Sequence, residues 1–385
     1  MTEQKKKKTL DLPLKIILTE EGINFFIKNQ KKLQKFRMAD NMEAYGFGLS
    51  QISPQTVQQM MNIHYVSKIE ISRTEFLSKR QEIVDISKLI IFEILYERFD
   101  YDIFHVLMRS DMIISWNRSN PGHIIDQRTK INDSYLQDVL TNKKEQINEI
   151  RMEILEPLFK QIDMNEKLLP EEKNIQLLLS EKYLVRLQPL IWFILTRNQG
   201  SADYLIMLND MRGHLRKYLD KSKIAEYTSL MVLELLSQAE NTNLLSYAGK
   251  IYKRQINSES LLFDQTLREK MLRELERNNE KLYLSWRITS RADGQQQLEI
   301  TIFNKESEYN AMREKINSRK TLEIKEKSLQ EFYSDSSEVQ TNTDLGMYYL
   351  SYLSDACRHE NVKFESNVHQ IISSDLTVIN LKLIF

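Results

Sequence analysis

The side chains that most often carry out chemistry are few in this sequence and stand apart from one another. The six histidines do not form HxH, HExxH or His-carboxylate patterns, so no zinc or hydrolase site is predicted. Cys357 is the only cysteine, and His359 lies where a helix would turn it to a different face. No GxSxG, Walker or dinucleotide-binding motif occurs. Cys357 is therefore predicted to be structural.

Two histidines have neighbours that suggest a role. His214 follows Arg212 and Gly213, which invites comparison with the phosphoacceptor histidine of a kinase, but the acidic residue and the proline of that motif are missing. We interpret His214 as a surface or interface residue. His123 follows the turn cluster 117–122, where a functional loop is one interpretation and a solvated turn the other.

Residues 341–347, with the sequence TNTDLGM, lie between polar residues and a predicted helix. A phosphate cradle is made by backbone N–H groups that approach an anion closely, so it needs several residues without a Cβ atom. Gly346 is the one glycine in this segment. The sequence therefore disfavours triphosphate binding here, although the start of the following helix could still cap an anion.

The composition excludes several classes of protein. Lys plus Arg and Asp plus Glu number 54 each in the 385 residues, so no net charge attracts nucleic acid. The lysine block 5–8 stands near one end of the chain. The apolar run 10–18 is too short and too polar for a signal segment or a membrane span. The single cysteine favours a reducing cytoplasm, and we expect a cytoplasmic protein without nucleic-acid binding or membrane insertion.

The first part of the chain is predicted to be helical. Apolar residues recur with a period near 3.6 in 20–37, with lysines on the other face. The segment 44–54 has two glycines and a proline and is predicted to be a loop. Segments with helical spacing follow at 56–64, 73–98, 104–116 and 132–163.

The last part of the chain has a mixed pattern. The nearly all-apolar segment 224–236 predicts an enclosed helix, and the charged segment 264–280 predicts an exposed one. Segments 281–290 and 298–305 are rich in β-branched and aromatic residues and flank Asp293-Gly294, which predicts an antiparallel hairpin. We then expect helices at 308–319 and 344–359 and strands at 363–368 and 376–385.

The predicted fold class is α+β, with a mainly helical N-terminal region and a C-terminal α/β sandwich. The predicted domains are a helical domain at 1–168, a helical connector or bundle at 169–221, and a third domain at 222–385.

The order of elements in this third domain resembles the GHKL (histidine-kinase-like, Bergerat-fold) ATPase domain. The first motif of that family is a glutamate followed four residues later by an asparagine and then alanine. Glu234 and Ala239 match it, and Gln238 takes the asparagine position. Leu345-Gly346-Met347 stands where the family has its second glycine box. The resemblance implies a mixed sheet covered on one face by helices, with nucleotide held between helices and a lid.

The sequence departs from the family pattern at the nucleotide-binding positions. Gln238 moves its amide one methylene outward from where the family asparagine carries Mg²⁺, and the octahedral shell of that ion tolerates little displacement. Asn304 stands where the family aspartate would contact adenine, and no glycine follows it. The resemblance therefore implies a degenerate pocket. Its residues would be Glu234, Gln238, Asn241, Asn304, Asp344 and Gly346.

Our main hypothesis is a cytoplasmic regulatory or scaffold protein whose degenerate GHKL domain binds a protein partner or a second copy, with no cofactor and no metal. The alternative is an ATP-binding GHKL kinase, of the anti-sigma or histidine-kinase-related type. It would use ATP and Mg²⁺, with Glu234 as the catalytic residue and Gln238 on the metal. A helical adaptor protein is a further alternative.

Overall fold

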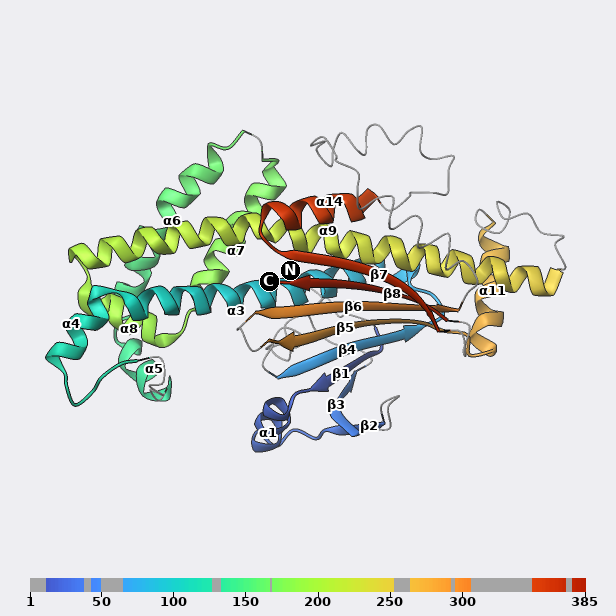
Figure 1. Cartoon of the computed structure of the whole chain (residues 1–385), viewed down its shortest axis with the longest axis horizontal. Helices are drawn as coiled ribbons and strands as arrows, with labels where there is room; N and C mark the ends of the chain where they lie inside the picture. Colours follow the sequence, from blue (N-terminus) through green and yellow to red (C-terminus); the bar gives the residue numbers. More distant parts are fainter. Residues whose placement is uncertain are drawn as a thin grey trace, which may run out of the picture. The chain divides into compact units, whose positions relative to one another are not determined.

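The computed structural model describes residues 12–37, 43–49, 65–126, 133–166, 168–252, 264–291, 295–305, 348–371 and 376–385. The chain forms two compact units (Figure 1). Unit 1 combines residues 1–93 with 224–385, and unit 2 consists of residues 94–223. Both boundaries fall inside long helices, α3 (Arg80–Arg109) and α9 (Ala202–Tyr252), so each helix contributes to both units.

Unit 1 is built on an eight-stranded sheet with the order β2-β3-β1-β4-β5-β6-β8-β7, and all of its pairings are antiparallel. The resemblance to GHKL domains implied a mixed sheet instead. The strands are β1 (Leu14–Leu18), β2 (Gln34–Arg37), β3 (Glu43–Leu49), β4 (Val66–Arg73), β5 (Leu282–Ser290), β6 (Gln296–Lys305), β7 (Lys363–Ile371) and β8 (Leu376–Ile384).

One face of this sheet forms the core of unit 1. Side chains alternate between the two faces of a strand, and in β5 the residues Leu284 and Trp286 are fully buried whereas Arg287 is exposed. Trp286 pairs with Ile69 on one side and with Ile300 on the other, so an apolar row crosses the central strands. The row forms because the paired strands place these apolar side chains next to one another.

The other elements of unit 1 are helical. They are α1 (Glu20–Lys28), a short 3-10 helix (Leu77–Lys79), the first part of α3, the second part of α9, α11 (Gln265–Arg277) and α14 (Tyr348–His359). Leu244 and Ala248 of α9 form a buried cluster with Met271 and Leu275 of α11. Helix α14 packs on β7, and its Tyr352 stacks with Tyr227 of α9 (Figure 1).

Unit 2 contains helices and their connections, with no strand in its described residues. Besides parts of α3 and α9 it contains α4 (Asp111–Ser119), α5 (Asp133–Thr141), α6 (Lys144–Asp163), α7 (Pro170–Val185) and α8 (Pro189–Asn198). Its core includes Phe99, Tyr183 and Tyr218, whose rings meet edge to face or tilted. No helix in the described part of the chain combines the length and the apolar character needed to cross a membrane.

The secondary structure predicted for the C-terminal part is confirmed where the chain is described. The hairpin is β5 and β6, the closing strands are β7 and β8, and the helix before them ends at His359 as expected. The mixed α+β class is also confirmed. The predicted helix at 308–319 lies outside the described residues.

The predictions for the N-terminal part were wrong in two places. The helix expected at 20–37 ends at Lys28, and 34–37 forms β2; the loop expected at 44–54 contains β3. In β3 a side chain at position 46 would overlap the carbonyl oxygen of Ile16, so Gly46 permits a close strand pairing. The helix expected at 56–64 lies outside the described residues.

The predicted domain boundaries differ from the compact units. The helical domain expected at 1–168 is divided between the units, because β4 pairs with β5 and so joins β1 to β4 to the C-terminal strands. The boundary expected at 221–222 lies close to the division at 223–224, but α9 runs through it without a break. Pairing between strands far apart in the sequence is not visible in local periodicity.

Candidate functional site

The six residues predicted to line a degenerate nucleotide pocket are brought together only in part. Glu234, Gln238 and Asn241 follow each other at helical spacing on α9, so they lie along one side of that helix and are half-buried. Asn304 is in β6 and pairs with Thr377 of β8. Asp344 and Gly346 lie outside the described residues.

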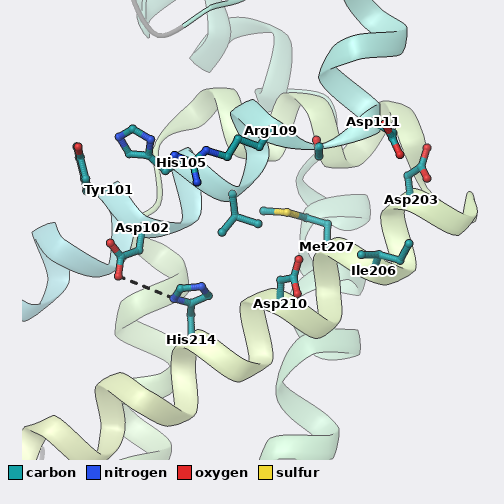
Figure 2. A pocket seen from close by; sticks show the side chains of 12 residues that line it. Tyr101, Asp102, His105, Arg109, Asp111, Asp203, Ile206, Met207, Asp210 and His214 are labelled. Carbon is teal, nitrogen blue, oxygen red and sulfur yellow. Dashed lines mark ion pairs between the residues drawn. The ribbon is translucent and has the colours of Figure 1, made fainter. Parts of the chain in front are cut away.

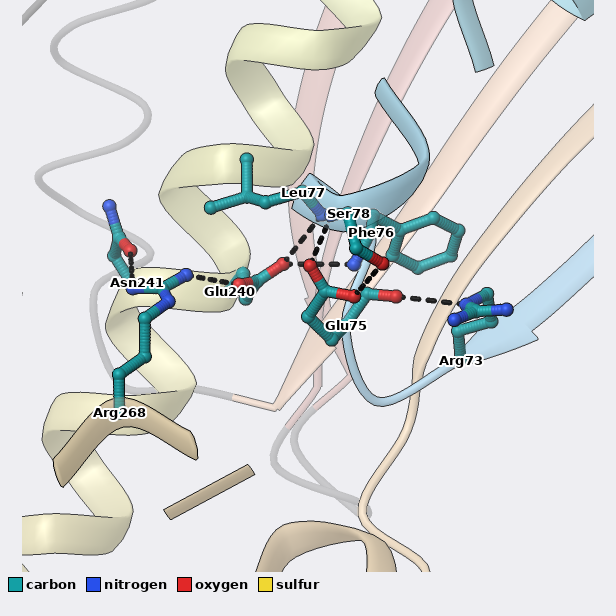
Figure 3. Close-up of polar contacts among 8 residues, drawn as sticks. All are labelled: Arg73, Glu75, Phe76, Leu77, Ser78, Glu240, Asn241 and Arg268. Atoms are coloured by element: carbon teal, nitrogen blue, oxygen red, sulfur yellow. Dashed lines mark hydrogen bonds and ion pairs between the residues drawn. The ribbon is translucent and has the colours of Figure 1, made fainter. Parts of the chain in front are cut away.

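The most closely connected polar group in this part of unit 1 is Glu240 of α9 (Figure 3). Its side chain is 1% exposed. Oε2 accepts hydrogen bonds from the backbone N–H groups of Phe76 at 2.9 Å and Leu77 at 3.2 Å. Phe76 precedes the 3-10 helix that leads into α3, and Leu77 is its first residue. Their N–H groups therefore have no hydrogen-bond partner within that helix. Glu240 thus caps one element from another that is distant in sequence.

Arg268 of α11 completes the arrangement and forms an ion pair with Oε1 of Glu240. Its other guanidinium nitrogen, Nη1, donates to Oδ1 of Asn241 at 3.1 Å. The Arg268 side chain is 17% exposed, so the ion pair is largely shielded from water. Helix α11 begins directly before it, where Asp264 accepts from the N–H groups of Thr266 and Leu267. We call Glu240, Asn241, Arg268 and the N–H groups of Phe76 and Leu77 the Glu240 cluster.

The loop that presents these N–H groups is itself held in place. Ser78 Oγ donates to Glu75 Oε2 at 2.5 Å, and Glu75 also accepts from the N–H of Ser78. Arg73 Nε donates to the carbonyl oxygen of Glu75 at 2.9 Å. Figure 3 shows how the loop places its backbone against the Glu240 carboxylate. The geometry of the cluster is therefore fixed from three segments of unit 1.

Burial sets the protonation behaviour of Glu240. Burial raises the pKa of its carboxyl above the ordinary value of 4.5, and the hydrogen bond from Phe76 and the charge of Arg268 offset this effect only in part. A raised pKa means that ionised Glu240 depends on its partners in the folded chain. Removing a partner would therefore be costly at neutral pH.

The Glu240 cluster joins structural elements and does not fit a nucleotide-bound metal ion. Mg²⁺ needs oxygen ligands around a positive centre, and here a guanidinium already supplies the positive charge between Glu240 and Asn241. The amide oxygen of Asn241 accepts from Arg268 and faces that charge. No group of three or more His, Cys, Asp or Glu side chains in the described ranges is arranged to hold a metal ion.

Sequence reasoning missed Glu240 and Arg268. The detectable signal was a carboxylate soon after the nearly all-apolar segment 224–236, because a buried carboxylate needs a cationic partner. Arg268 stands in a segment with many charged residues, and nothing local distinguishes it from its neighbours. Only the packing of α11 on α9 identifies the pair.

The structure also places the single cysteine and two histidines. Cys357 is buried in α14, and burial raises the pKa of its thiol to about 12, which supports a structural role. His123 is exposed after the predicted turn, and its carbonyl oxygen accepts from Trp116 Nε1 at 3.1 Å. His214 lies on α9 in unit 2, 3.9 Å from Asp102, and lines a cavity there.

Comparisons with known proteins place the chain among proteins whose function has not been established. Residues 5–385 match the model of a family of unknown function, DUF8084. An uncharacterized protein of Treponema pallidum (strain Nichols) is 36% identical over 389 residues, covering all of both chains. No solved structure matches this one with statistical significance.

Proposed function

The chain belongs to the DUF8084 family, and we propose that it is a cytoplasmic regulatory or scaffold protein in which a degenerate GHKL-like domain serves as a binding platform without ATP chemistry. The domain would correspond to the C-terminal part of unit 1. Its partner would be another protein or a second copy of the chain.

The observation that carries the proposal is the guanidinium of Arg268. In a working GHKL site, an amide on the first helix would hold Mg²⁺ against a triphosphate. In α9 Gln238 takes the position of that amide, and less than one turn further along the helix Glu240 and Asn241 are both bound to Arg268. The arginine supplies a positive charge beside this stretch of α9 from within the protein, so a metal ion would meet repulsion there.

The order of elements supports the GHKL part of the proposal. The second part of α9, then α11, β5, β6, α14, β7 and β8, follow one another as the resemblance implies. The first four strands pair beyond β5 and extend the sheet, which the resemblance did not imply. With these four strands, the sheet that could bind a partner would be larger than the sheet of a GHKL domain alone.

Isothermal titration calorimetry of the full chain with ATP and Mg²⁺ tests the absence of nucleotide chemistry. We expect no saturation up to millimolar ATP and no release of phosphate. A micromolar dissociation constant that is lost in Glu234→Ala would contradict the proposal and favour the ATP-binding kinase.

The binding role needs a separate measurement. Light scattering coupled to size-exclusion chromatography measures self-association of the same preparation across a range of concentrations. A concentration-dependent dimer would assign the platform to a second copy. A strict monomer would direct the search to another protein, to be tested by crosslinking in cells followed by mass spectrometry. A monomer that crosslinks to no other protein would contradict the platform role.

A further inference from the structure

Unit 2 contains an open cavity of about 690 Å³ between the end of α3, the start of α4 and the first part of α9 (Figure 2). Its volume lies within the roughly 300–1,000 Å³ typical of small-ligand sites. The polar and charged lining includes Asp102, His105, Arg109, Asp111, Asp203, Asp210 and His214. Val106, Ile206 and Met207 supply the apolar part.

One of the four aspartates in this lining already has partners. Asp102 accepts a hydrogen bond from Tyr218 Oη at 2.8 Å, and its other oxygen lies 3.7 Å from Arg98. His214 Nδ1 is 3.9 Å from the same carboxylate (Figure 2). Asp102 is thus held in place at one end of the cavity, and its charge is balanced by Arg98.

The other three aspartates are available to a ligand. Asp111, Asp203 and Asp210 have no ion pair in the described part of the chain, and Arg109 is the one arginine or lysine in the lining. Three carboxylates against one guanidinium leave an excess of two negative charges. Figure 2 shows Asp111 and Asp203 at one side of the cavity and Asp210 beside Met207. A ligand that matches this surface carries more than one positive charge.

The spacing of these charges does not match the ligand set of a metal ion. No three acidic or histidine side chains in the described ranges converge as metal ligands would. The apolar side chain of Ile206 lies on the same helix as Asp203 and Asp210 and is 60% exposed, whereas Met207 beside it is 1% exposed. Separated carboxylates with apolar contacts between them suit an alkyl chain that bears ammonium groups at intervals.

We propose that this cavity binds a ligand with two or more ammonium groups on aliphatic chains, either a free polyamine or a lysine-containing segment of a partner protein. The aspartates would hold the ammonium groups, and Ile206 would contact the methylenes. The proposal does not depend on the function proposed for unit 1, because every lining residue lies in unit 2.

A structural role explains two of the free aspartates but not the third. Asp111 and Asp203 lie in the first turns of α4 and α9, where a negative charge stabilises a helix in any case. Asp210 lies well inside α9 and is exposed, so the helix end gives no reason for its charge. Asp210→Asn is therefore the informative substitution.

The test is a calorimetric titration of the full chain at low ionic strength with two probes: spermidine, and a blocked peptide of alternating lysine and glycine. We expect saturable binding of at least one probe, weakened about threefold by Asp210→Asn and about tenfold by Asp203→Asn combined with Asp210→Asn. Asp138→Asn is the matched control, because it removes the same charge from an exposed position on α5.

The outcomes separate the two sources of the ligand. Tighter binding of spermidine assigns the cavity to a free polyamine, and tighter binding of the peptide assigns it to a partner protein. The same peptide with acetylated lysines should not bind. The proposal fails if neither probe saturates. It also fails if Asp210→Asn binds the probes no more weakly than the control Asp138→Asn does.

Discussion

The Glu240 cluster of unit 1 and the cavity of unit 2 both contain carboxylates, but they differ in whether these carboxylates have partners within the protein. Glu240 is buried, and both of its oxygens have partners within the protein. Asp111, Asp203 and Asp210 face an open cavity without an ion pair in the described part of the chain. A charge that the fold satisfies internally is not available to a ligand. A charge left unpaired at a concave surface remains available to a ligand.

The largest effect that this comparison predicts follows from Arg268→Ala. The substitution leaves the Glu240 carboxylate buried without its cation, and we expect a loss of about 3 kcal/mol in the free energy of unfolding at neutral pH. Urea denaturation followed by circular dichroism measures it. Arg273→Ala is the control, because Arg273 on the same helix is exposed and pairs with the exposed Glu269. Equal losses in the two variants would show that the Glu240 cluster has no special role.

A second prediction concerns the pH dependence of that loss. Without Arg268 the pKa of Glu240 rises further, so the folded chain takes up a proton more readily than the unfolded chain. The proton bound to Glu240 contributes to the free energy of unfolding at pH values below 4.5, the ordinary pKa of the carboxyl group. This contribution is lost as the pH rises through the pKa of Glu240 in the folded chain. We therefore expect the difference between Arg268→Ala and the unsubstituted chain to shrink in acid.

Denaturation curves of both chains, recorded below and above that window, measure this pH dependence. A difference that stays constant with pH would show that Glu240 is not the group that Arg268 neutralises. The unsubstituted chain should show the same sign with a smaller amplitude, because its Glu240 pKa is raised as well.

Asn241→Ala should have a smaller effect. The substitution removes one hydrogen bond to Arg268, but the ion pair with Glu240 remains, so we expect a loss of about 1 kcal/mol in the free energy of unfolding. If Asn241 were instead a nucleotide ligand, the variant would change ATP binding and leave stability nearly unaltered. Thermal unfolding with and without ATP and Mg²⁺ distinguishes the two results.

The smallest effect on stability is expected in the cavity of unit 2. Asp210→Asn removes an exposed charge without a partner, so the free energy of unfolding should change by less than about 0.5 kcal/mol. The same variant is expected to weaken ligand binding, which separates the two roles. A destabilisation as large as that of Arg268→Ala would mean that Asp210 stabilises the fold instead.

Two parts of the sheet differ in how well the sequence predicted them. Strands β5 and β6 are rich in β-branched and aromatic residues and follow each other directly, so the hairpin was predictable from local pattern. Strand β3 contains Gly46 and Gly48, which favour a loop by composition, and the pairing with β1 gives Gly46 its role. The candidate site shows the same limit. Glu234 and Gln238 were predicted from the resemblance to a family motif that lies on one helix, whereas the partners of Glu240 come from two other segments.

The sequence by itself determined the balanced charge, the scarcity of catalytic side chains, the class of the fold and the C-terminal order of elements, because each of these depends on composition or on neighbours within a few residues. The tertiary structure decided that the first four strands join the C-terminal sheet, that Arg268 meets Glu240, and that three aspartates share one cavity. These depend on which distant surfaces pack together. That choice is made by burial and hydrogen bonding summed over the whole unit, which no local pattern records.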